Sequence, residues 1–335
     1  SLYQRKPVSL PAFASSEISD YVSQVLAERP IGTIYAFSGQ MGQFIPESFT
    51  GKVIFDFVDV DSAKFDAYAA RDAGIRRWVH AREGRLLRAE EARLARRSDV
   101  SLLVSPEEAA LFQERLTPQD RSTCDVRSIR NGIDSRYFDP SVVTPSAAMM
   151  ACPGPRLIFA GQMDYAPNVE GALRVIDRLL PSIRATMPRT TFHVVGRSPD
   201  EELAARHGRD GVHVWGGVDD IRTFLAAADV ALIPLEIARG VQNKVLEAMA
   251  MSLPVVLTTA AVTGTDAVDG KHVTIADTDE DLVDRTTALL AHPRQGLALG
   301  QEARTFVVEN LSWQATLAPL ADLIRRRQDV ARHAA

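Results

Sequence analysis

The sequence has few of the features that mark secreted, membrane-spanning or nucleic-acid-binding proteins. It contains only two cysteines, Cys124 and Cys152, which have neither the spacing of metal ligands nor the density of a disulfide scaffold. No apolar run approaches the roughly 20 residues that span a bilayer, and the first residues lack the apolar stretch of a signal peptide. The net charge of −5 argues against nucleic acid as a partner. We therefore expect a globular, cytoplasmic protein.

The chain is long enough for two domains, because 335 residues exceed what one ordinary hydrophobic core organises. In the first 150 residues, short apolar runs alternate with segments of helical periodicity. The predicted strands are residues 31–37, 53–58, 100–104 and 126–129. The predicted helices are residues 62–73, 82–97 and 106 to about 116.

Residues 139–155 contain four prolines and no lysine or arginine, so we place the domain boundary there. Beyond it, strands at 157–160, 191–195, 212–215, 230–233, 255–258 and 273–275 alternate with helices. Such alternation predicts a parallel sheet covered on both faces. The sequence thus predicts two Rossmann-like, doubly wound α/β domains, residues 1–150 and 154–312. A long last helix, residues 313–333, is expected to pack back on the first domain.

The most informative segment is residues 234–254, where a buried strand is followed by a loop with Gly240 and then a helix. Free N–H groups at a helix start attract anions, and the helix dipole adds to the attraction. Arg239 and Lys244 add positive charge there, and Glu247 on nearly the same face can accept hydrogen bonds from sugar hydroxyls. The alternative is an ordinary helix start with solvated charges.

This segment resembles the donor-binding stretch of the glycosyltransferase group 1 family. Glu247-Ala-Met-Ala, followed by Pro254-Val-Val, matches the second half of that stretch. Further motifs of the family occur in order from residue 131 to about 265. They are Asn131-Gly-Ile-Asp134, Phe159-Ala-Gly161-Gln-Met163, Val195-Gly196, Trp215-Gly-Gly-Val218 and Ala227-Ala-Asp-Val-Ala-Leu-Ile-Pro234.

The resemblance implies a GT-B fold, in which two Rossmann-like domains face a cleft. It also implies transfer of a sugar from a UDP- or GDP-sugar, with retention and without a metal or other cofactor. Glu247 would hold the ribose, and backbone N–H groups after Gly240 would bind the diphosphate. The donor-binding residues expected on this basis are Gly161, Gln162, Gly196, Trp215, Gly240, Val241, Gln242, Lys244 and Glu247.

The chain departs from the family pattern at three places. Arg239 stands where the family has the glutamate that contacts the donor sugar. Gln162 and Asn168 fall near the family's phosphate-binding arginine and lysine, and neither is charged. We therefore expect Arg239 and Lys244 to offset the diphosphate charge, and both are catalytic candidates. Nothing before Ile31 resembles the family's opening strand and acceptor loop, so the first domain is expected to be incomplete.

A narrower resemblance is to the sugar transferases of bacterial exopolysaccharide and PEP-CTERM systems. It rests on Phe55-Asp-Phe-Val-Asp-Val-Asp-Ser62, Met163-Asp-Tyr-Ala-Pro-Asn168 and Gly240-Val-Gln-Asn-Lys244. It implies synthesis of a surface polysaccharide on a lipid-linked or saccharide acceptor.

Three other features are candidates outside the donor segment. Asp59 and Asp61 follow a predicted strand, where they can bind the acceptor or act as a base; turn formation and helix capping are the alternatives. His80 is interpreted as packed rather than catalytic. The arginine-rich helix 82–97 suggests peripheral contact with the inner membrane face, although a solvated helix face also explains it.

Two other functions remain open at this point. One is a nucleotide-sugar epimerase of the same fold, which converts a donor without any acceptor. The other is a non-catalytic nucleotide-binding scaffold, suggested by the missing glutamate and the incomplete first domain.

Overall fold

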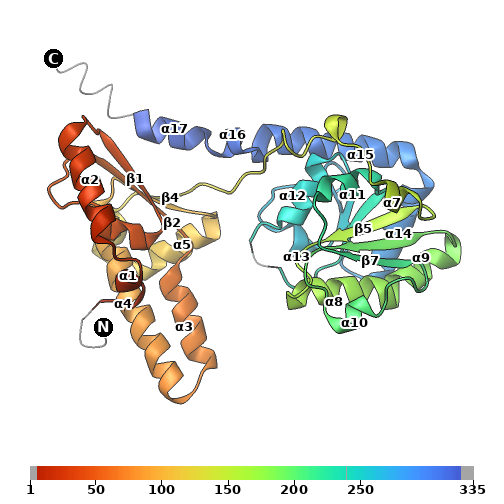
Figure 1. The fold of residues 1–335 in the computed structure, drawn as a ribbon, viewed down its shortest axis with the longest axis horizontal. Helices are drawn as coiled ribbons and strands as arrows, with labels where there is room; N and C mark the ends of the chain where they lie inside the picture. The colour runs from red at the N-terminus through yellow and green to blue at the C-terminus, as the bar shows by residue number, and fades with distance from the viewer. Residues whose placement is uncertain (1–5, 239, 326–335) are drawn as a thin grey trace. The chain divides into compact units, whose positions relative to one another are not determined.

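The computed structural model describes residues 6–238 and 240–325, and the chain divides into two compact units (Figure 1). Unit 1 comprises the residues up to Arg130 together with the segment from Leu317, and unit 2 comprises Asn131–Thr316. Each unit contains one sheet whose paired strands are all parallel. Parallel strands connected through helices define Rossmann-like α/β units, so the predicted fold class is confirmed.

The sheet of unit 1 has the strand order β1-β2-β3-β4. Its strands are β1 (Thr33–Phe37), β2 (Lys52–Val58), β3 (Val100–Leu103) and β4 (Val126–Ser128). Its helices are α1 (Ser9–Ala12), α2 (Ser16–Glu28), η1 (Gly39–Phe44), α3 (Asp61–Arg71), α4 (Gly74–Arg97), α5 (Pro106–Arg115), α6 (Pro118–Thr123) and α17 (Ala318–Arg325). Phe55, Phe112 and Leu94 are fully buried at the centre of this unit.

The sheet of unit 2 has the order β10-β9-β8-β5-β6-β7. Its strands are β5 (Arg156–Ala160), β6 (Thr191–Val195), β7 (Val212–Gly216), β8 (Val230–Ile233), β9 (Val255–Leu257) and β10 (Thr274–Ile275). Its helices are η2 (Pro140–Val142), α7 (Ala147–Met150), α8 (Ala166–Arg174), η3 (Val175–Leu179), α9 (Leu180–Thr186), α10 (Glu201–Ala204), α11 (Ile221–Ala227), α12 (Asn243–Ala250), α13 (Thr259–Val262), α14 (Asp279–Ala291), α15 (Pro293–Phe306), η4 (Val307–Leu311) and α16 (Trp313–Thr316).

The strand order of unit 2 reverses beside β5. The chain builds β5, β6 and β7 in one direction, and β8, β9 and β10 extend the sheet from the other side of β5. In open parallel sheets, ligands bind in the crevice beyond the carboxyl ends of the strands at such a switch point. A ligand site is therefore expected at the loops after β5 and β8.

The predicted linker is a packed part of unit 2. Contacts place the division between Arg130 and Asn131, well before the boundary expected near residue 150. Residues 139–155 contain η2 and α7, Met149 is fully buried, and the Ser146 N–H donates to the Thr223 carbonyl. Periodicity is absent there because the helices are too short to show it, not because the segment is unpacked.

Two predicted helices differ in extent from the observed ones. The helix expected over residues 82–97 begins eight residues earlier, at Gly74, because its first two turns bury no side chain and so show no amphipathic pattern. The helix expected over 313–333 is divided into α16 and α17 near Leu317. Its residues beyond 325 lie outside the described part of the chain. Leu323 of α17 is buried against Ile54 and Leu102 of unit 1.

Candidate functional site

Glycine turns bring three backbone segments together at the carboxyl edge of the unit 2 sheet. Gly161 follows β5 and Gly196 follows β6, and the Gly161 N–H donates to the Val195 carbonyl at 3.0 Å. A Cβ atom on Gly196 would lie 1.5 Å from the Gly161 carbonyl oxygen. A Cβ atom on Gly161 would lie 2.9 Å from Asn168 Nδ2 and 3.1 Å from Lys244 Cε. A side chain at position 196 would prevent the two main-chain turns from approaching this closely. A side chain at position 161 would crowd Asn168 and Lys244.

Lys244 of α12 is a largely buried cation whose hydrogen-bond partners are neutral. Its Nζ donates to Asn168 Oδ1 at 2.9 Å and to Gln242 Oε1 at 3.3 Å. Asn168 is buried, and its Nδ2 donates to the Gln162 carbonyl at 2.8 Å, which fixes its orientation. Burial lowers the pKa of Lys244 to about 8, while Glu247 acts in the opposite direction. The amine therefore lies beside Asn168, which falls near one of the family's two cationic positions.

Glu247 lies one turn further along α12. Burial raises the pKa of its carboxyl, and the Lys244 charge partly offsets that effect. Among the described residues, no hydrogen bond or ion pair engages this carboxylate. Charged groups withdrawn from solvent are normally paired, so an unpaired one is a candidate ligand site. The pair of groups can receive an anion at Lys244 and hydroxyl donors at Glu247.

The loop between β8 and α12 presents backbone N–H groups at the same edge. Gly240 has φ +62°, a left-handed conformation that glycine adopts without steric cost. Helix α12 begins at Asn243, two residues later than expected, with Gln242 at its N-cap and no side chain capping it. The first turn of any helix leaves N–H groups without intrahelical acceptors. The predicted contacts of Val241 and Gln242 with a diphosphate are consistent with this geometry, and Arg239 lies outside the described residues.

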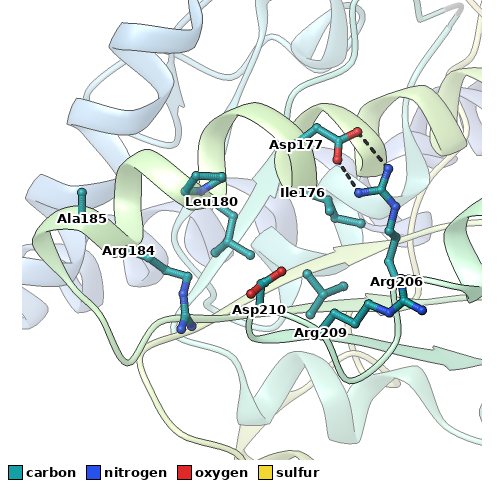
Figure 2. Close-up of a pocket in the computed structure, with 10 residues that line it drawn as sticks. Ile176, Asp177, Leu180, Arg184, Ala185, Arg206, Arg209 and Asp210 are labelled. Atoms are coloured by element: carbon teal, nitrogen blue, oxygen red, sulfur yellow. Dashed lines mark hydrogen bonds and ion pairs between the residues drawn. The ribbon is translucent and has the colours of Figure 1, made fainter.

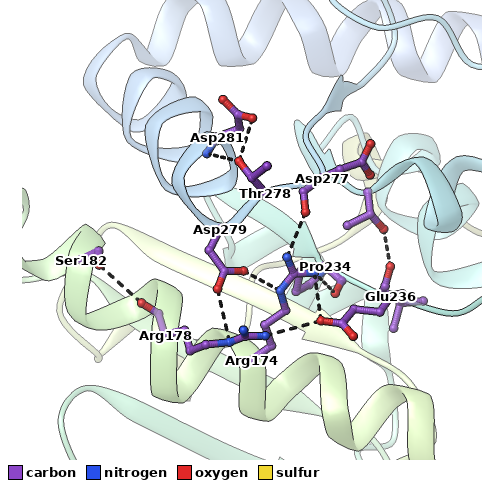
Figure 3. Close-up of polar contacts among 11 residues, drawn as sticks. Arg174, Arg178, Ser182, Pro234, Glu236, Asp277, Thr278, Asp279 and Asp281 are labelled. Atoms are coloured by element: carbon purple, nitrogen blue, oxygen red, sulfur yellow. Dashed lines mark hydrogen bonds and ion pairs between the residues drawn. The ribbon is translucent and has the colours of Figure 1, made fainter.

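An arginine that the sequence did not single out fixes the start of this loop (Figure 3). Arg174 of α8 donates to the Pro234 carbonyl at 3.1 Å and the Asp277 carbonyl at 3.0 Å, and pairs with Asp279 at 2.7 Å. Arg178 contacts Asp279 and the exposed Glu236 at 3.3 and 3.4 Å. With 33 arginines in the chain, no local signal distinguishes Arg174.

Replacing Arg174 with methionine should lower both stability and nucleotide affinity. The substitution keeps an apolar stem but leaves two backbone carbonyls without a donor, at a cost of about 1–3 kcal/mol. Thermal denaturation and nucleotide titration measure the two effects. Arg178→Met is the matched control, because Arg178 is 54% exposed and its pairs contribute little. Equal behaviour of the two variants would contradict this role for Arg174.

Trp215, expected near the nucleotide base, uses its indole N–H within the unit. It donates to His193 Nδ1 at 3.1 Å, and its ring packs edge-on against Phe224 of α11. His193 is fully buried, and burial lowers its pKa to about 3, so the imidazole is neutral. The Trp215 indole is therefore positioned by packing against the sheet, and only its remaining exposed edge is open to a base.

Asp59 and Asp61 lie beyond β2 in unit 1, where they line a small hollow with Gln40, Glu90 and Glu91. The Gln40 amide donates to Asp61 Oδ2 at 3.1 Å. The Ser62 N–H at the start of α3 donates to Glu91 Oε1 at 2.9 Å, and capping by Asp61 or Ser62 itself is not observed. The two carboxylates thus line one hollow of unit 1.

The backbone beside this hollow is strained. Val58, the last residue of β2, has φ +67°, which is rare for a β-branched residue. Its N–H donates to Asp56 Oδ1 at 3.0 Å, and the Val60 N–H donates to Glu108 Oε2 at 2.8 Å. Strain that the surroundings maintain is concentrated at functional sites, which supports the prediction for the two aspartates.

A cavity of about 650 Å³ lies at the other edge of the unit 2 sheet, between η3, α9 and the loop before β7 (Figure 2). An Asp177–Arg206 ion pair at 2.6 Å crosses one end of it. Arg184 and Asp210 also line it. Since it lies at the amino ends of β6 and β7, we assign the ligand site to the carboxyl edge instead.

The described residues contain no group of three or more histidine, cysteine, aspartate or glutamate side chains arranged to hold a metal ion. They also contain no helix with the length and apolar character to cross a bilayer.

Comparison with known sequences identifies the family of the second unit. Residues 154–292 match the family model described as Glycosyl transferases group 1. A GDP-mannose-dependent alpha-(1-6)-phosphatidylinositol monomannoside mannosyltransferase of Mycolicibacterium smegmatis is 33% identical over 169 residues, 45% of this chain and 44% of that protein. An MMP alpha-(1->4)-mannosyltransferase of Mycolicibacterium hassiacum is 38% identical over 127 residues, 36% of this chain and 30% of that protein. The matches thus span less than half the length of these curated relatives.

Solved structures share the fold at low sequence identity. HepE from Anabaena, solved in complex with UDP, has a TM-score of 0.63 at 14% identity, covering 96% of this chain and 84% of that one. Sucrose-phosphate synthase from Thermosynechococcus elongatus has a TM-score of 0.62 at 16% identity, covering 94% and 78%. The fold is therefore the GT-B type. Residues 154–292 match the group 1 glycosyltransferases, which confirms the resemblance found in the sequence.

Proposed function

We propose that the chain is a glycosyltransferase that moves a sugar from a UDP- or GDP-sugar to an acceptor. The observation that carries the proposal is the pair of largely buried, opposite charges on α12. Lys244 is bonded only to neutral side-chain groups, and Glu247 has no partner among the described residues. A nucleoside diphosphate supplies an anion for Lys244 and the vicinal hydroxyls of a ribose for Glu247.

In this account, the donor is bound across the switch point of unit 2. Glu247 accepts hydrogen bonds from the ribose hydroxyls, and Gly161 admits the donor close to the main chain. Lys244 and the N–H groups at the start of α12 stabilise the charge that develops on the departing diphosphate. This arrangement supplies positive charge without a metal, in keeping with the metal-independent transfer that we propose. Retention of configuration rests on the family resemblance.

The acceptor is proposed to be lipid-linked or a saccharide, in the synthesis of a bacterial surface polysaccharide. The narrower sequence resemblance supports this assignment, and the mannosyltransferase of Mycolicibacterium smegmatis acts on a phosphatidylinositol mannoside by its name. Asp59 and Asp61 of unit 1 are the proposed acceptor-side groups. We propose that the enzyme works in the cytoplasm, in peripheral contact with the membrane.

The pH dependence of nucleotide binding tests the role of Lys244. Binding of a diphosphate favours the protonated amine, whose pKa in the free protein is about 8. Affinity should be steady below about pH 7 and fall above pH 8, by at most about tenfold per pH unit. Calorimetric titration of UDP and GDP between pH 7 and 9 measures this fall.

Lys244→Met is the matched variant for that titration. It should bind the cognate nucleotide at least about tenfold more weakly at pH 7 and lose most of the fall in affinity above pH 8. Wild-type affinity in Lys244→Met, or an unchanged pH profile, would show that the amine does not meet the diphosphate. Absence of binding by every nucleoside diphosphate would overturn the donor site itself.

A further inference from the structure

A helical hairpin projects from the carboxyl edge of the unit 1 sheet (Figure 1). Helix α3 begins shortly after β2 ends at Val58, and α4 returns to the start of β3. With 24 residues, α4 is about 36 Å long, whereas the seven-residue strand β2 spans about 23 Å. Every buried residue of α4 lies at Glu83 or beyond. The first half of α4 therefore packs only against α3 and extends past the sheet.

The end of this hairpin exposes large apolar side chains. Ile75 is 82% exposed, Trp78 58% and Val79 38%. Their spacing of three and four residues places them on one side of α4. The first two turns of α4 bury no side chain. An exposed apolar cluster of this kind usually marks an interaction surface.

The same end of the hairpin is basic. Arg71, Arg76 and Arg77 are exposed, and in the described ranges none of them has an ion-pair partner. The nearest acid along the chain is Asp72, which is engaged by His80 Nδ1 at 2.8 Å. Three exposed arginines without ion-pair partners in the described ranges thus flank the apolar cluster, against the single carboxylate of Asp72.

The hairpin is held in shape before any partner binds. Gly74 has φ +59° at the turn, and the Asp72–His80 contact joins the end of α3 to α4. The ring of His80 also packs against Phe65 and Tyr68, with centroids 5.8 and 5.6 Å apart. His80 is therefore a packed residue of the hairpin. The tip is already ordered, so binding a partner does not require the tip to fold.

We propose that residues 71–79, the hairpin tip, insert into the surface of an anionic lipid bilayer. Tryptophan prefers the interface between headgroups and acyl chains, and arginine side chains bind lipid phosphates there. The uncompensated positive charge favours an anionic lipid surface over a neutral protein partner. The hollow that contains Asp59 and Asp61 lies at the same edge of unit 1, so the contact brings a lipid-linked acceptor to it. Delivery of an acceptor to this hollow rests on the proposed function, whereas lipid binding does not.

This surface differs from the one that the sequence suggested. The two large apolar side chains Leu87 and Leu94 of segment 82–97 are buried, and Leu94 belongs to the core of unit 1. The arginines of that segment include Arg93, paired with Glu90 at 2.7 Å. Contact with lipid is therefore assigned to the tip and not to the second half of α4.

Flotation with lipid vesicles tests the proposal without donor or acceptor. Wild-type protein should float with vesicles of phosphatidylglycerol and phosphatidylethanolamine, but not with phosphatidylcholine alone, and should be released by high salt. The variants Ile75→Ser/Trp78→Ser and Arg76→Gln/Arg77→Gln should each reduce binding at least about tenfold. Leu297→Ser is the matched control, since Leu297 is a 61% exposed residue of unit 2.

Two results would overturn the proposal: no binding of wild-type protein to anionic vesicles at low salt, or full binding by the Ile75→Ser/Trp78→Ser variant. Nucleotide-induced thermal stabilisation should be unchanged in every hairpin variant, which verifies folding. It also separates the two claims, because loss of the donor site leaves vesicle binding intact. Vesicles should shift the tryptophan emission of the wild type to the blue, and Trp78→Phe should remove most of that shift.

Discussion

Replacing Glu247 with alanine is expected to weaken binding of the cognate nucleoside diphosphate by about ten- to a hundredfold. The reason is that hydrogen bonds to a charged acceptor contribute about 1.5–3 kcal/mol, and ribose hydroxyls have no other carboxylate to meet on α12. The carboxylate makes no hydrogen bond or ion pair among the described residues of the free protein, so its removal breaks neither and loses only the longer-range attraction to Lys244. Calorimetric titration of UDP and GDP measures the change.

The control for this variant is Glu170→Ala, which removes an exposed carboxylate from α8 of the same unit. It should bind nucleotide as the wild type does. The melting temperature of free Glu247→Ala should stay close to that of the wild type, so that weaker binding cannot be attributed to unfolding. Wild-type affinity in Glu247→Ala would contradict the assignment of the ribose to this residue.

Replacing Gly196 with alanine should be among the most destabilising single changes in unit 2. The new Cβ would lie 1.5 Å from the Gly161 carbonyl oxygen, and both groups belong to the main chain. One of the two strand ends must therefore move, with an expected cost of about 3 kcal/mol or more. Because β5 and β6 are displaced at their carboxyl ends, nucleotide binding should be lost as well. Urea denaturation measures the loss of stability.

Gly296→Ala provides the comparison within the same unit. Gly296 lies in helix α15, and a Cβ there would meet Pro254 at an ordinary 3.5 Å. This variant should be neutral or slightly stabilised, because alanine favours the helix over glycine. If Gly196→Ala unfolds at the same urea concentration as Gly296→Ala, the close approach of the two glycine turns is not as described.

The strands of unit 2 could be predicted from the sequence because they are short runs rich in β-branched and apolar residues, and β6, β8 and β9 are buried on both faces. All six predicted strands agree with β5 to β10 within a residue at each end, and the helix start after Gly240 was found within two residues. The first candidate site followed from the same pattern, since carboxyl ends of parallel strands share an edge.

Contacts between distant segments could not be predicted in this way. Lys244 reaches Asn168 across 76 positions of sequence, and Arg174 reaches Asp279 across 105. Both helices of the α3–α4 hairpin were predicted, but the early start of α4 at Gly74 was not, because its first two turns bury no side chain and show no periodicity. The proline-rich segment 139–155 was interpreted as a linker because its short helices carry too few residues to show a period.

The most direct test of the central claim measures both the release of the nucleotide and the transfer of the sugar from the donor. The full chain is incubated with UDP- and GDP-sugars labelled in the sugar, together with a bacterial lipid extract. We expect one donor to release free nucleoside diphosphate while its label passes to the extract, and Glu247→Ala to slow both at donor concentrations below its weakened dissociation constant. Conversion of the sugar without an acceptor would indicate an epimerase, and tight donor binding with neither release nor transfer would indicate a scaffold. Either result would contradict the assignment as a glycosyltransferase.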